Sequence, residues 1–505
     1  MSNFLFIAAV ACSIGLTPTD SAGASESFVV DTLDALRIAM KAAKPGAVIE
    51  VADGSYDLQR DLEFKRLQGT LNAPITIRAK NRLQATITGD HVVKVRDSEH
   101  FVLEGFRFRM RADVYGKNGA LRLRCSHHCR IAHNDFELDE RNTDDKNQTW
   151  LTVDGHGSGY NRIDHNRFAN KSKKGHFLFI TGEDQYVSQH DLIERNHFVD
   201  RAYGNDANEY ETIRVGESRV GNQSGKSYTI IRENLFQRCQ GEDELVSCKV
   251  GGCSFSCNTV VDCHGSVVFR NGNDSVYSGN MILNKYHSRP FDAYRAGGIR
   301  FYGAGHRVFN NYFEGLNGTS MKAPLALMHG APAGSGALGV ADGLPATDCE
   351  VVHNTWVRCA QLRLGISSEK RPLKPKQCVF ANNIVCETDD KRLLNIHEGE
   401  GITFGGNILY ATRGKDTGIE EAAYTSEEFL ITDPKLELRG ETFRLSPDSP
   451  AVSAATFAFA YVDEDIDGAP RGNKRDIGAD EYSTETINRP LSPTEVGPLQ
   501  SKQSR

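Results

Sequence analysis

One short motif recurs through most of the chain and constrains its fold more than any other feature. It has two or three β-prone residues, one or two polar residues, an asparagine and then an apolar residue, as in Arg130-Ile-Ala-His-Asn-Asp-Phe136 and Arg162-Ile-Asp-His-Asn-Arg-Phe168. The asparagines of the motif are Asn134, Asn166, Asn196, Asn234, Asn258, Asn280, Asn311, Asn354, Asn383 and Asn407. Their spacings run from 22 to 43 residues. A constant minimum with longer excursions indicates a coil of fixed size with loops inserted in it.

This pattern predicts an all-β, single-domain, right-handed parallel β-helix. In such a fold the inward side chains of each coil stack on those of the next coil, about 4.8 Å away. Asparagine suits the bend between two strands, because it tolerates the left-handed backbone conformation and can pair with the asparagines above and below. A β-propeller and a leucine-rich array compete with this prediction, but the chain has neither a Trp-Asp blade signature nor a leucine consensus.

The two ends of the chain differ from the repeat. Residues 1–24 contain a short apolar run followed by small residues, which predicts a secretory signal peptide and a secreted or periplasmic protein. Residues 31–43 predict an amphipathic helix that caps the first coil. We therefore expect one β-helix domain over residues 28–482 and a flexible tail over residues 483–505.

The overall charge says little about partners. The 505 residues carry a formal net charge of −7, from 59 basic and 66 acidic residues. This balance gives no general attraction to nucleic acid or to an anionic membrane, so we expect neither as a partner. A monomer is expected, and any site for an acidic polymer must be local.

Four stretches in the middle of the chain carry a family resemblance. They are Asn208-Glu-Tyr-Glu-Thr-Ile-Arg-Val-Gly216, Glu242-Asp-Glu-Leu-Val-Ser-Cys-Lys249, Gly265-Ser-Val-Val-Phe-Arg-Asn-Gly272 and Gly297-Gly-Ile-Arg-Phe-Tyr-Gly303. With them the chain resembles the chondroitinase-B-like polysaccharide lyases, the sixth lyase family, which contains alginate lyases and a dermatan sulfate lyase. The resemblance implies a right-handed parallel β-helix that cleaves a uronate polymer by Ca²⁺-assisted β-elimination and gives unsaturated products.

The resemblance also implies roles for single residues. Asn208, Glu242 and Glu244 match the calcium ligands, Lys249 the general base and Arg270 the general acid. Carboxylates at positions i and i+2 of a strand share one face, and two like charges so close repel unless a cation lies between them. Carboxylate and amide oxygens suit Ca²⁺. The alternative is an ordinary solvated acidic strand.

The chain departs from the family pattern in two places. Asn271 stands where histidine commonly follows the arginine. Around the lysine, Cys248 stands where asparagine commonly precedes it, and Val250 follows it instead of serine. These departures leave the Lys249–Arg270 pair intact and bear on substrate preference and rate.

β-Elimination requires a base that is neutral near pH 7 and a group that stabilises the leaving oxygen. Lysine has an ordinary pKa of about 10.4, which must fall for it to take the C5 proton of a uronate near neutral pH. A neighbouring guanidinium and Ca²⁺ act in that direction as like charges. Arginine is nearly always protonated, so Arg270 is better suited to stabilising the leaving oxygen. The 21 residues between Lys249 and Arg270 predict adjacent coils within one groove. The alternative is two unrelated surface groups.

An acidic polymer also needs cations and hydrogen-bonding groups along the groove. Arg300, in the Gly-Gly-Ile-Arg motif, is the best candidate for a substrate contact. Further candidates are Arg214, Tyr302, His306 and Glu211, of which Glu211 is also a possible extra metal ligand. The alternative for each of these is an ordinary surface residue.

The cysteines follow the repeat. Cys349 and Cys378 each precede a motif asparagine by five residues, and Cys239 and Cys263 each follow one by five. Equal offsets on neighbouring coils predict the disulfides Cys239–Cys263 and Cys349–Cys378. The alternative is a column of reduced, buried cysteines. Residues 125–129, Cys-Ser-His-His-Cys, lack a second ligand pair, so a zinc site is not indicated there.

Taken together, these patterns predict an alginate lyase acting on mannuronate-containing blocks. The alternatives are a dermatan sulfate lyase of the same fold, a non-catalytic carbohydrate-binding β-helix, and a pectate-type lyase or hydrolase. A binding module need not keep the lysine, arginine and acidic residues together, and a hydrolase needs a cluster of aspartates that the repeat does not show on neighbouring coils.

Overall fold

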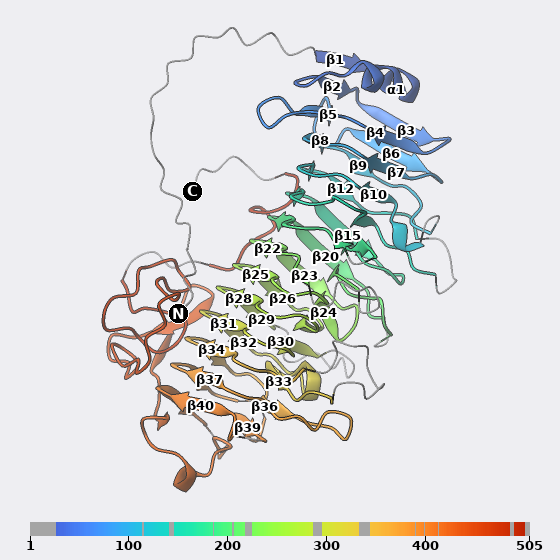
Figure 1. Ribbon diagram of the computed structural model, residues 1–505. Coiled ribbons are helices and arrows are strands. Elements are labelled where there is room, and N and C mark those ends of the chain that lie inside the picture. The colour runs from blue at the N-terminus through green and yellow to red at the C-terminus, as the bar shows by residue number, and fades with distance from the viewer. Residues whose placement is uncertain are drawn as a thin grey trace, which may run out of the picture.

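The computed structural model describes residues 27–113, 116–140, 146–184, 186–204, 207–217, 225–285, 295–332, 344–388, 390–397, 399–412, 414–484 and 489–499. The predicted signal peptide lies outside these residues. Within them the chain winds into an elongated stack of coils, and each coil contributes one strand to each of three long parallel sheets (Figure 1). The prediction of an all-β, right-handed parallel β-helix is thereby confirmed.

The first sheet, sheet A, has fourteen strands. In spatial order they are β1 (Ser27–Val30), β2 (Val48–Val51), β5 (Ile75–Ala79), β8 (Phe101–Glu104), β11 (Arg130–Ala132), β14 (Arg162–Asp164), β19 (Leu192–Glu194), β22 (Ile230–Arg232), β25 (Ser254–Ser256), β28 (Val276–Ser278), β31 (Arg307–Phe309), β34 (Glu350–Val352), β37 (Cys378–Ala381) and β40 (Ile402–Gly405).

Sheet B follows sheet A in each coil and also has fourteen strands. They are β3 (Gly54–Leu58), β6 (Ala85–Gly89), β9 (Arg107–Phe108), β12 (Asp135–Phe136), β15 (Arg167–Lys171), β20 (His197–Arg201), β23 (Leu235–Cys239), β26 (Thr259–Val261), β29 (Met281–Leu283), β32 (Tyr312–Glu314), β35 (Thr355–Val357), β38 (Ile384–Cys386), β41 (Asn407–Tyr410) and β42 (Phe429–Ile431).

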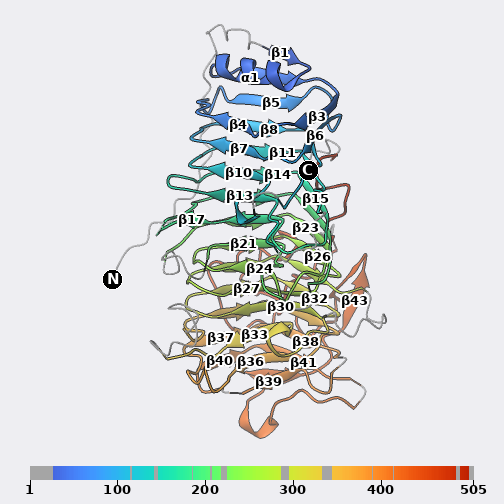
Figure 2. The same ribbon diagram turned by 90° about the vertical axis from the view of Figure 1, so that its right-hand side faces the viewer.

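Sheet C completes the coil with twelve strands, most of which Figure 2 shows stacked in one column. They are β4 (Leu62–Lys65), β7 (Val93–Arg96), β10 (Leu121–Arg124), β13 (Leu151–Asp154), β16 (Leu178–Ile180), β21 (Ile213–Val215), β24 (Glu244–Cys248), β27 (Gly265–Phe269), β30 (Ala296–Phe301), β33 (Leu325–Met328), β36 (Leu362–Ile366) and β39 (Leu394–Ile396).

The remaining elements are short and lie outside the three sheets. Two antiparallel pairs are formed by β17 (Gly182–Glu183) with β18 (Tyr186–Val187) and by β43 (Leu436–Arg439) with β44 (Thr442–Leu445). The helical elements are α1 (Leu33–Ala42) and the 3₁₀ turns η1 (Gly116–Asn118), η2 (Ser320–Lys322) and η3 (Glu421–Ala423). No helix among the described residues has the length and apolar character needed to cross a membrane.

The motif asparagines form a continuous ladder at the corner between sheets A and B. At each step the backbone N–H and the side-chain amide of one asparagine donate to the Oδ1 atom of the next, as from Asn234 to Asn258 at 2.9 and 3.0 Å. The same two bonds recur from Asn134 through to Asn407. Each step therefore supplies partners for buried polar groups that would otherwise be costly.

One detail of the corner differs from the expectation. The left-handed backbone conformation belongs to the residue before the ladder asparagine, as at His133 (φ 55°), His165 (φ 53°) and Glu233 (φ 52°). The asparagine itself keeps a negative φ, because its side chain must lie along the stack to reach its neighbours. The sharp turn and the hydrogen-bond ladder are thus divided between two consecutive residues.

The apolar residue two positions after the asparagine builds the core. The rings of Phe108, Phe136, Phe168, Phe198 and Phe236 stack on one another, with centroids 4.6 to 5.2 Å apart. All five side chains are at most 1% exposed. This column explains why the motif ends in an apolar residue: each ring buries both faces against its neighbours.

The helix α1 covers the first coil, as predicted. The side chain of Thr32 accepts a hydrogen bond from the N–H of Ala35 and so caps the helix, and Leu36 and Met40 are buried against the core. Ile38, on the opposite side of the helix, is 70% exposed. The end of the stack is thereby shielded from edge-to-edge pairing.

The segment after the last coil folds back along the stack (Figure 1). Buried residues such as Leu445, Ile466 and Ile477 cover outward side chains of sheet B. Part of the predicted tail is described as well: the N–H of Leu491 donates to Thr259 and that of Gly497 to the carbonyl of Arg195. Residues 489–499 therefore lie against the β-helix.

The cysteine pairs are neighbours, but the disulfide predictions are corrected. The backbone N–H of Cys239 donates to the Sγ atom of Cys263 at 3.3 Å, the thiols of Cys349 and Cys378 donate to backbone carbonyls, and all eleven described cysteines are free. Stacked residues of parallel strands keep their Cβ atoms about 4.8 Å apart, which exceeds the roughly 3.5–4.5 Å that a disulfide requires. Burial raises the pKa of Cys263 well above its usual range, so this thiol stays protonated.

Candidate active site

The predicted catalytic pair lies where two neighbouring strands of sheet C end. Cys248 of β24 is in register with Phe269 of β27, so Lys249 and Arg270 occupy the next position on adjacent coils. Tyr302 follows on the coil after, because Phe269 is in register with Phe301 of β30. The 21-residue spacing therefore corresponds to one coil, as predicted.

A second row of outward side chains runs beside the first. Arg214, Ser247, Val268 and Arg300 are in register on β21, β24, β27 and β30. The regular pairing breaks in these same strands, with register shifts between Glu244 and Val246 and again at the start of β27. Such bulges turn side chains away from strict alternation and are frequent beside functional sites.

Glu244 stands at the centre of the cationic groups. Its Oε1 atom accepts hydrogen bonds from Arg270 Nη1 at 2.6 Å and Arg300 Nη2 at 2.5 Å, and its Oε2 atom accepts one from Ser247 Oγ at 2.5 Å. Burial works to raise the pKa of the Glu244 carboxyl, but Arg300, Arg270 and Lys249 outweigh burial and lower this pKa to about 2. The carboxylate is thus held charged with three cations around it.

Lys249 is anchored on the other side by Glu211. The Lys249 Nζ atom lies 3.4 Å from Glu211 Oε1, and His176 Nδ1 lies 3.4 Å from Glu211 Oε2. The Glu211 side chain also shares a hydrogen bond with Glu242, whose Oε1 atom accepts from the N–H of Tyr210 at 2.9 Å. Lys249 is 11% exposed, whereas the carboxylates around it are almost fully buried.

The two adjacent carboxyl groups titrate far apart. Burial, together with the negative charges of Glu211 and Glu244, raises the pKa of Glu242 to about 10. Burial also works to raise the pKa of Glu211, but His176 and Lys249 outweigh it and hold that pKa below its ordinary value. In the absence of a cation, the neighbouring carboxyl groups therefore oppose each other's ionisation.

Arg201 fixes the backbone that presents these acidic groups. Its guanidinium is fully buried and donates to the carbonyls of Tyr210, Lys173 and Gly175 at 2.9 to 3.1 Å, and it lies over the Tyr210 ring. These bonds tie the segment before β16, which carries His176, to the segment that carries Glu211. Their relative position is therefore set by an arginine from sheet B.

The other sequence candidates have different surroundings. Arg214 is 8% exposed and lies over the Phe179 ring, within the row described above. Tyr302 is 4% exposed, with the Arg371 guanidinium over its ring. Asn208 is exposed on the segment leading to β21. The structure thus places Arg214 and Tyr302 in the strand rows beside the predicted catalytic pair and leaves Asn208 exposed.

His306 is not part of the cluster. Its side chain is fully buried, its Nδ1 atom accepts from the N–H of Ser275 at 3.1 Å, and its Nε2 atom lies 2.7 Å from the carbonyl oxygen of Tyr302. Burial lowers the pKa of His306 to about 4. With both ring nitrogens bound to the backbone, this histidine fixes a turn and has no nitrogen left for a substrate, which corrects its expected role.

The two departures from the family pattern have unequal consequences. The Cys248 side chain belongs to the apolar core and hydrogen-bonds to Cys253, so it does not face the groove. Asn271 directly follows Arg270, and its backbone N–H donates to the carbonyl of Cys248 at 3.3 Å. Both changed residues thus adjoin the predicted catalytic pair in sequence, and only Cys248 is packed into the apolar core.

Sequence reasoning missed His176, Arg201 and Ser247. His176 and Arg201 stand in no motif with a recognisable spacing, and each acts through a partner on another coil. Ser247 had the one usable signal: it lies three residues after Glu244 in the same stretch, within reach of the carboxylate once the bulge forms.

A comparison with known protein families assigns the chain to one of them. Residues 30–435 match the family described as Chondroitinase B. The chain belongs to the Chondroitinase B family. No curated protein matches it in sequence.

Solved structures agree with this assignment at the level of the fold. The chain is similar to the PL6 family alginate lyase AlyGC, with a TM-score of 0.74 and 22% identity over 95% of this chain and 59% of that one. It is also similar to the PL6 family polysaccharide lyase Pedsa3628 from Pseudopedobacter saltans, with a TM-score of 0.63 and 19% identity over 94% and 99% of the two chains.

A third structure is a mannuronic acid specific family 6 lyase from human gut microbiota. It has a TM-score of 0.62 and 22% identity over 77% of this chain and 87% of that one. This Chondroitinase B family chain therefore spans about three fifths of the length of AlyGC, 59%, and nearly all of Pedsa3628. At such identities the likeness establishes the fold.

The acidic residues can be tested for the calcium ion that the family resemblance implies. Glu211, Glu242 and Glu244 bring three buried carboxyl groups together, and the Oε2 atom of Glu211 accepts no hydrogen bond. Burial and the negative charges of Glu211 and Glu244 both raise the pKa of Glu242. Hard oxygen donors that repel one another are the set that a divalent cation relieves, so the residues fit Ca²⁺ in their chemistry.

Proposed function

We propose that this protein is a secreted or periplasmic polysaccharide lyase that cleaves alginate at mannuronate-containing blocks by Ca²⁺-assisted β-elimination. One observation carries the proposal: Lys249 and Arg270 stand at the same position on adjacent coils, on either side of the buried Glu244 carboxylate. A base and a cationic group set side by side are what the removal of a proton and the loss of a neighbouring oxygen require.

Lys249 is the residue that takes the C5 proton. Its stem is buried and its Nζ atom is held by Glu211 at 3.4 Å, which fixes the amine in one place. Because the amine is already fixed, little further entropy is lost when it reacts with a bound sugar. Lys249 must be deprotonated at the moment of transfer, and Arg270 and a bound Ca²⁺ would favour its neutral form as like charges.

Arg270 serves the leaving oxygen. Its side chain is 30% exposed and therefore accessible from the groove, while its Nη1 atom is oriented by Glu244. A guanidinium keeps its proton, so its contribution is a fixed positive charge and hydrogen bonds to the oxygen as the C4–O bond breaks. Proton delivery through water completes the elimination.

The acidic group would hold the calcium ion. Glu242 and Glu244 would bind it, with Glu211 as a further carboxylate and Asn208 as an amide ligand from the rim. When bound, Ca²⁺ neutralises the uronate carboxylate and stabilises the charge that develops next to it. Arg300, Arg214 and Tyr302 are the proposed contacts to the polymer.

The proposal is tested with a panel of four substrates: polymannuronate, polyguluronate, mixed alginate and dermatan sulfate, each with and without EDTA. We expect unsaturated products, measured by their ultraviolet absorbance, from polymannuronate and mixed alginate, and a loss of that activity in EDTA that Ca²⁺ restores. Absence of unsaturated products from all four polymers would refute lyase action. Full activity in EDTA would refute the metal-assisted part.

Dermatan sulfate is included because the matching family takes its name from chondroitinase B. Activity on this polymer alone would replace the alginate assignment with the dermatan sulfate alternative. Stoichiometric binding of a polymer without turnover would instead favour a carbohydrate-binding β-helix.

A further inference from the structure

A histidine pair and a glutamate meet on the surface at the corner between sheets C and A, away from the groove. His127 and His128 lie in the turn between β10 and β11, and Glu99 lies in the same turn one coil earlier, between β7 and β8. Glu99 and His127 pair through an isolated parallel bridge, so they are in register on adjacent coils. The stacking of the coils has brought together residues 28 positions apart.

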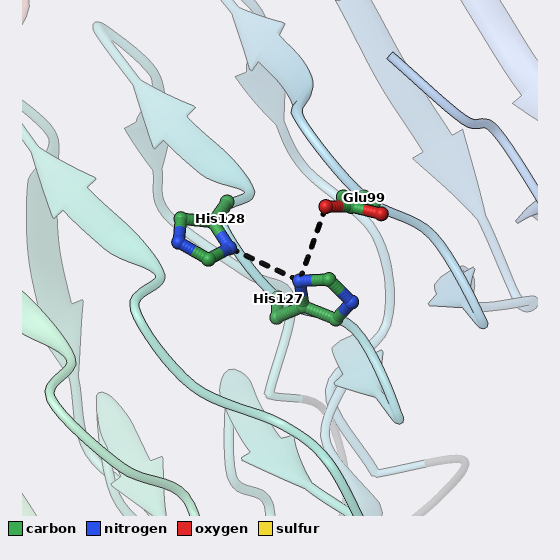
Figure 3. A group of neighbouring side chains, drawn as sticks. All are labelled: Glu99, His127 and His128. Atoms are coloured by element: carbon green, nitrogen blue, oxygen red, sulfur yellow. Dashed lines mark hydrogen bonds and ion pairs between the residues drawn. The ribbon is translucent and has the colours of Figure 1, made fainter. Parts of the chain in front are cut away.

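The backbone makes the two histidines converge. Consecutive side chains of an extended chain point to opposite sides. His128, however, has the left-handed conformation, with φ 54°, and this reverses the alternation at that residue. Figure 3 shows the result: the two imidazoles face each other, and the Glu99 carboxylate approaches His127 from the neighbouring coil.

The distances match those of a small metal centre. His127 Nδ1 lies 3.0 Å from His128 Nδ1 and 3.7 Å from Glu99 Oε1. One ligand atom from each residue lies within 4.8 Å of the other two. Tetrahedral zinc with bonds of about 2.0–2.2 Å separates its ligands by about 3.3–3.6 Å. The His127–His128 and His127–Glu99 separations therefore lie within a few tenths of an ångström of those in a tetrahedral centre.

Neighbouring rings hold the group in place. His100 Nε2 lies 3.5 Å from Glu99 Oε1, and the His100 ring stacks on the His128 ring with centroids 4.8 Å apart. On its other face the His128 ring stacks on Tyr160 at 5.0 Å. Metal ligands are commonly oriented by such outer contacts. His128 is exposed, so the fourth position of a bound ion would face solvent.

We propose that Glu99, His127 and His128 form a binding site for a divalent transition-metal ion of the zinc class. Two imidazole nitrogens and one carboxylate oxygen are a ligand set typical of zinc, with one position left open. Cys129, which follows the histidines in sequence, takes no part: it is buried, its thiol donates to the carbonyls of Ser98 and His127, and burial raises its pKa to about 12.

A second group of two histidines and a carboxylate differs from this site in the partners of its carboxylate. Asp164, His165 and His133 also lie close together. Both carboxylate oxygens of Asp164 are already bound by Arg130, at 2.8 and 2.6 Å. The charge of this carboxylate is therefore already balanced by the Arg130 guanidinium. Among the described residues, Glu99 is approached by no arginine or lysine at ion-pair distance.

The test uses the full chain, stripped of metal with a chelator and then supplied with excess Ca²⁺ so that the proposed calcium site stays filled. Zn²⁺ is titrated, and its binding is measured by calorimetry and by equilibrium dialysis. We expect one Zn²⁺ per chain in the wild type. We expect Glu99→Gln to weaken binding about tenfold or more and His127→Ala to abolish it.

The control is His156→Ala, because His156 is an exposed histidine near a single carboxylate, with its Nε2 atom 3.5 Å from Asp184. It should bind Zn²⁺ as the wild type does. Glu99→Gln is nearly isosteric, and it keeps the test decisive if the histidine variant does not fold.

A second readout follows from the two coils that supply the ligands. An ion that joins them binds only the folded chain, so Zn²⁺ should raise the Tm of the wild type and of His156→Ala but not that of Glu99→Gln. Equal Zn²⁺ binding by the wild type and Glu99→Gln would overturn the proposal, as would no stoichiometric binding by the wild type. Neither measurement depends on lyase activity. The zinc proposal can therefore fail while the proposed lyase function stands.

Discussion

The same coils build the asparagine ladder and the charged cluster on sheet C. The ladder pairs identical residues, whereas the cluster pairs unlike ones. At the corner between sheets A and B each polar group is satisfied by its equivalent one coil away, in an identical geometry from Asn134 to Asn407. On sheet C the side chains pair across unlike positions: Glu244 with arginines one and two coils away, and Glu211 with His176 and Lys249.

The strand pairing of the two regions also differs, because it is regular at the ladder and irregular in sheet C. Among the described strand pairs, register shifts are confined to sheet C, at β24 with β27, β27 with β30 and β33 with β36. A repeat stabilises the fold because every step is the same, whereas a site needs several different groups at one point. The bulges supply that difference where the acidic and basic residues meet.

The largest effect is expected at the catalytic pair. Lys249→Ala and Arg270→Ala should each lower the rate of unsaturated-product formation about 10³-fold or more, because each removes a group that acts in the transition state. The fold, followed by circular dichroism, should remain. Lys226→Ala is the control, since Lys226 forms a surface ion pair with Asp274 at 2.8 Å. Near wild-type rates in either variant would sink the assignment.

The ladder should respond in stability instead. Asn258→Ala removes the acceptor of two bonds from Asn234 and the donor to the carbonyl of Ile231, so we expect a loss of about 3 kcal/mol in the free energy of unfolding. Denaturant unfolding measures it. Asn81→Ala, which removes an exposed amide bonded to Asp53, should change stability by less than about 0.5 kcal/mol. Equal losses in the two variants would mean that the ladder adds nothing.

Calcium binding at the predicted site should affect stability as well as activity. Because Ca²⁺ relieves the repulsion among Glu211, Glu242 and Glu244, it should stabilise the folded chain by about 2.7 kcal/mol at a hundredfold excess over its dissociation constant. Glu242→Gln should lose most of this gain, which thermal melting measures. Glu63→Gln, at an exposed surface pair with Arg96, is the control. A rise in Tm that is the same in both variants would exclude these ligands.

The smallest effect concerns a third repeated feature, the surface column of stacked rings that contains Tyr160. Tyr160 lies between His128 and His190, with centroids 5.0 and 4.7 Å away, and it is 53% exposed. Tyr160→Ala should cost about 0.5–1.5 kcal/mol, the usual value of an aromatic pair, with lyase activity unchanged. A loss as large as that of Asn258→Ala would show that exposed columns stabilise the coils as strongly as buried ones.

Much of the site could be foreseen because it inherits the period of the coil. The spacing of Lys249 and Arg270 predicted adjacent coils, and their strands are paired in register. His306 could not be judged in the same way: it stands beside the groove motif in sequence, but its ring turns inward and bonds to the backbone. Direction at a turn depends on the local backbone, which spacing does not reveal.

The sequence by itself determined the coil, the asparagine ladder, the phenylalanine column and the capping helix, because each repeats with a period that nearest neighbours enforce. Only the tertiary structure decided which unlike side chains meet: Arg300 with Glu244, His176 with Glu211, and Glu99 with His127. It also decided that the paired cysteines stack as thiols. These contacts depend on loop lengths and bulges between coils, which shift single residues without disturbing the period.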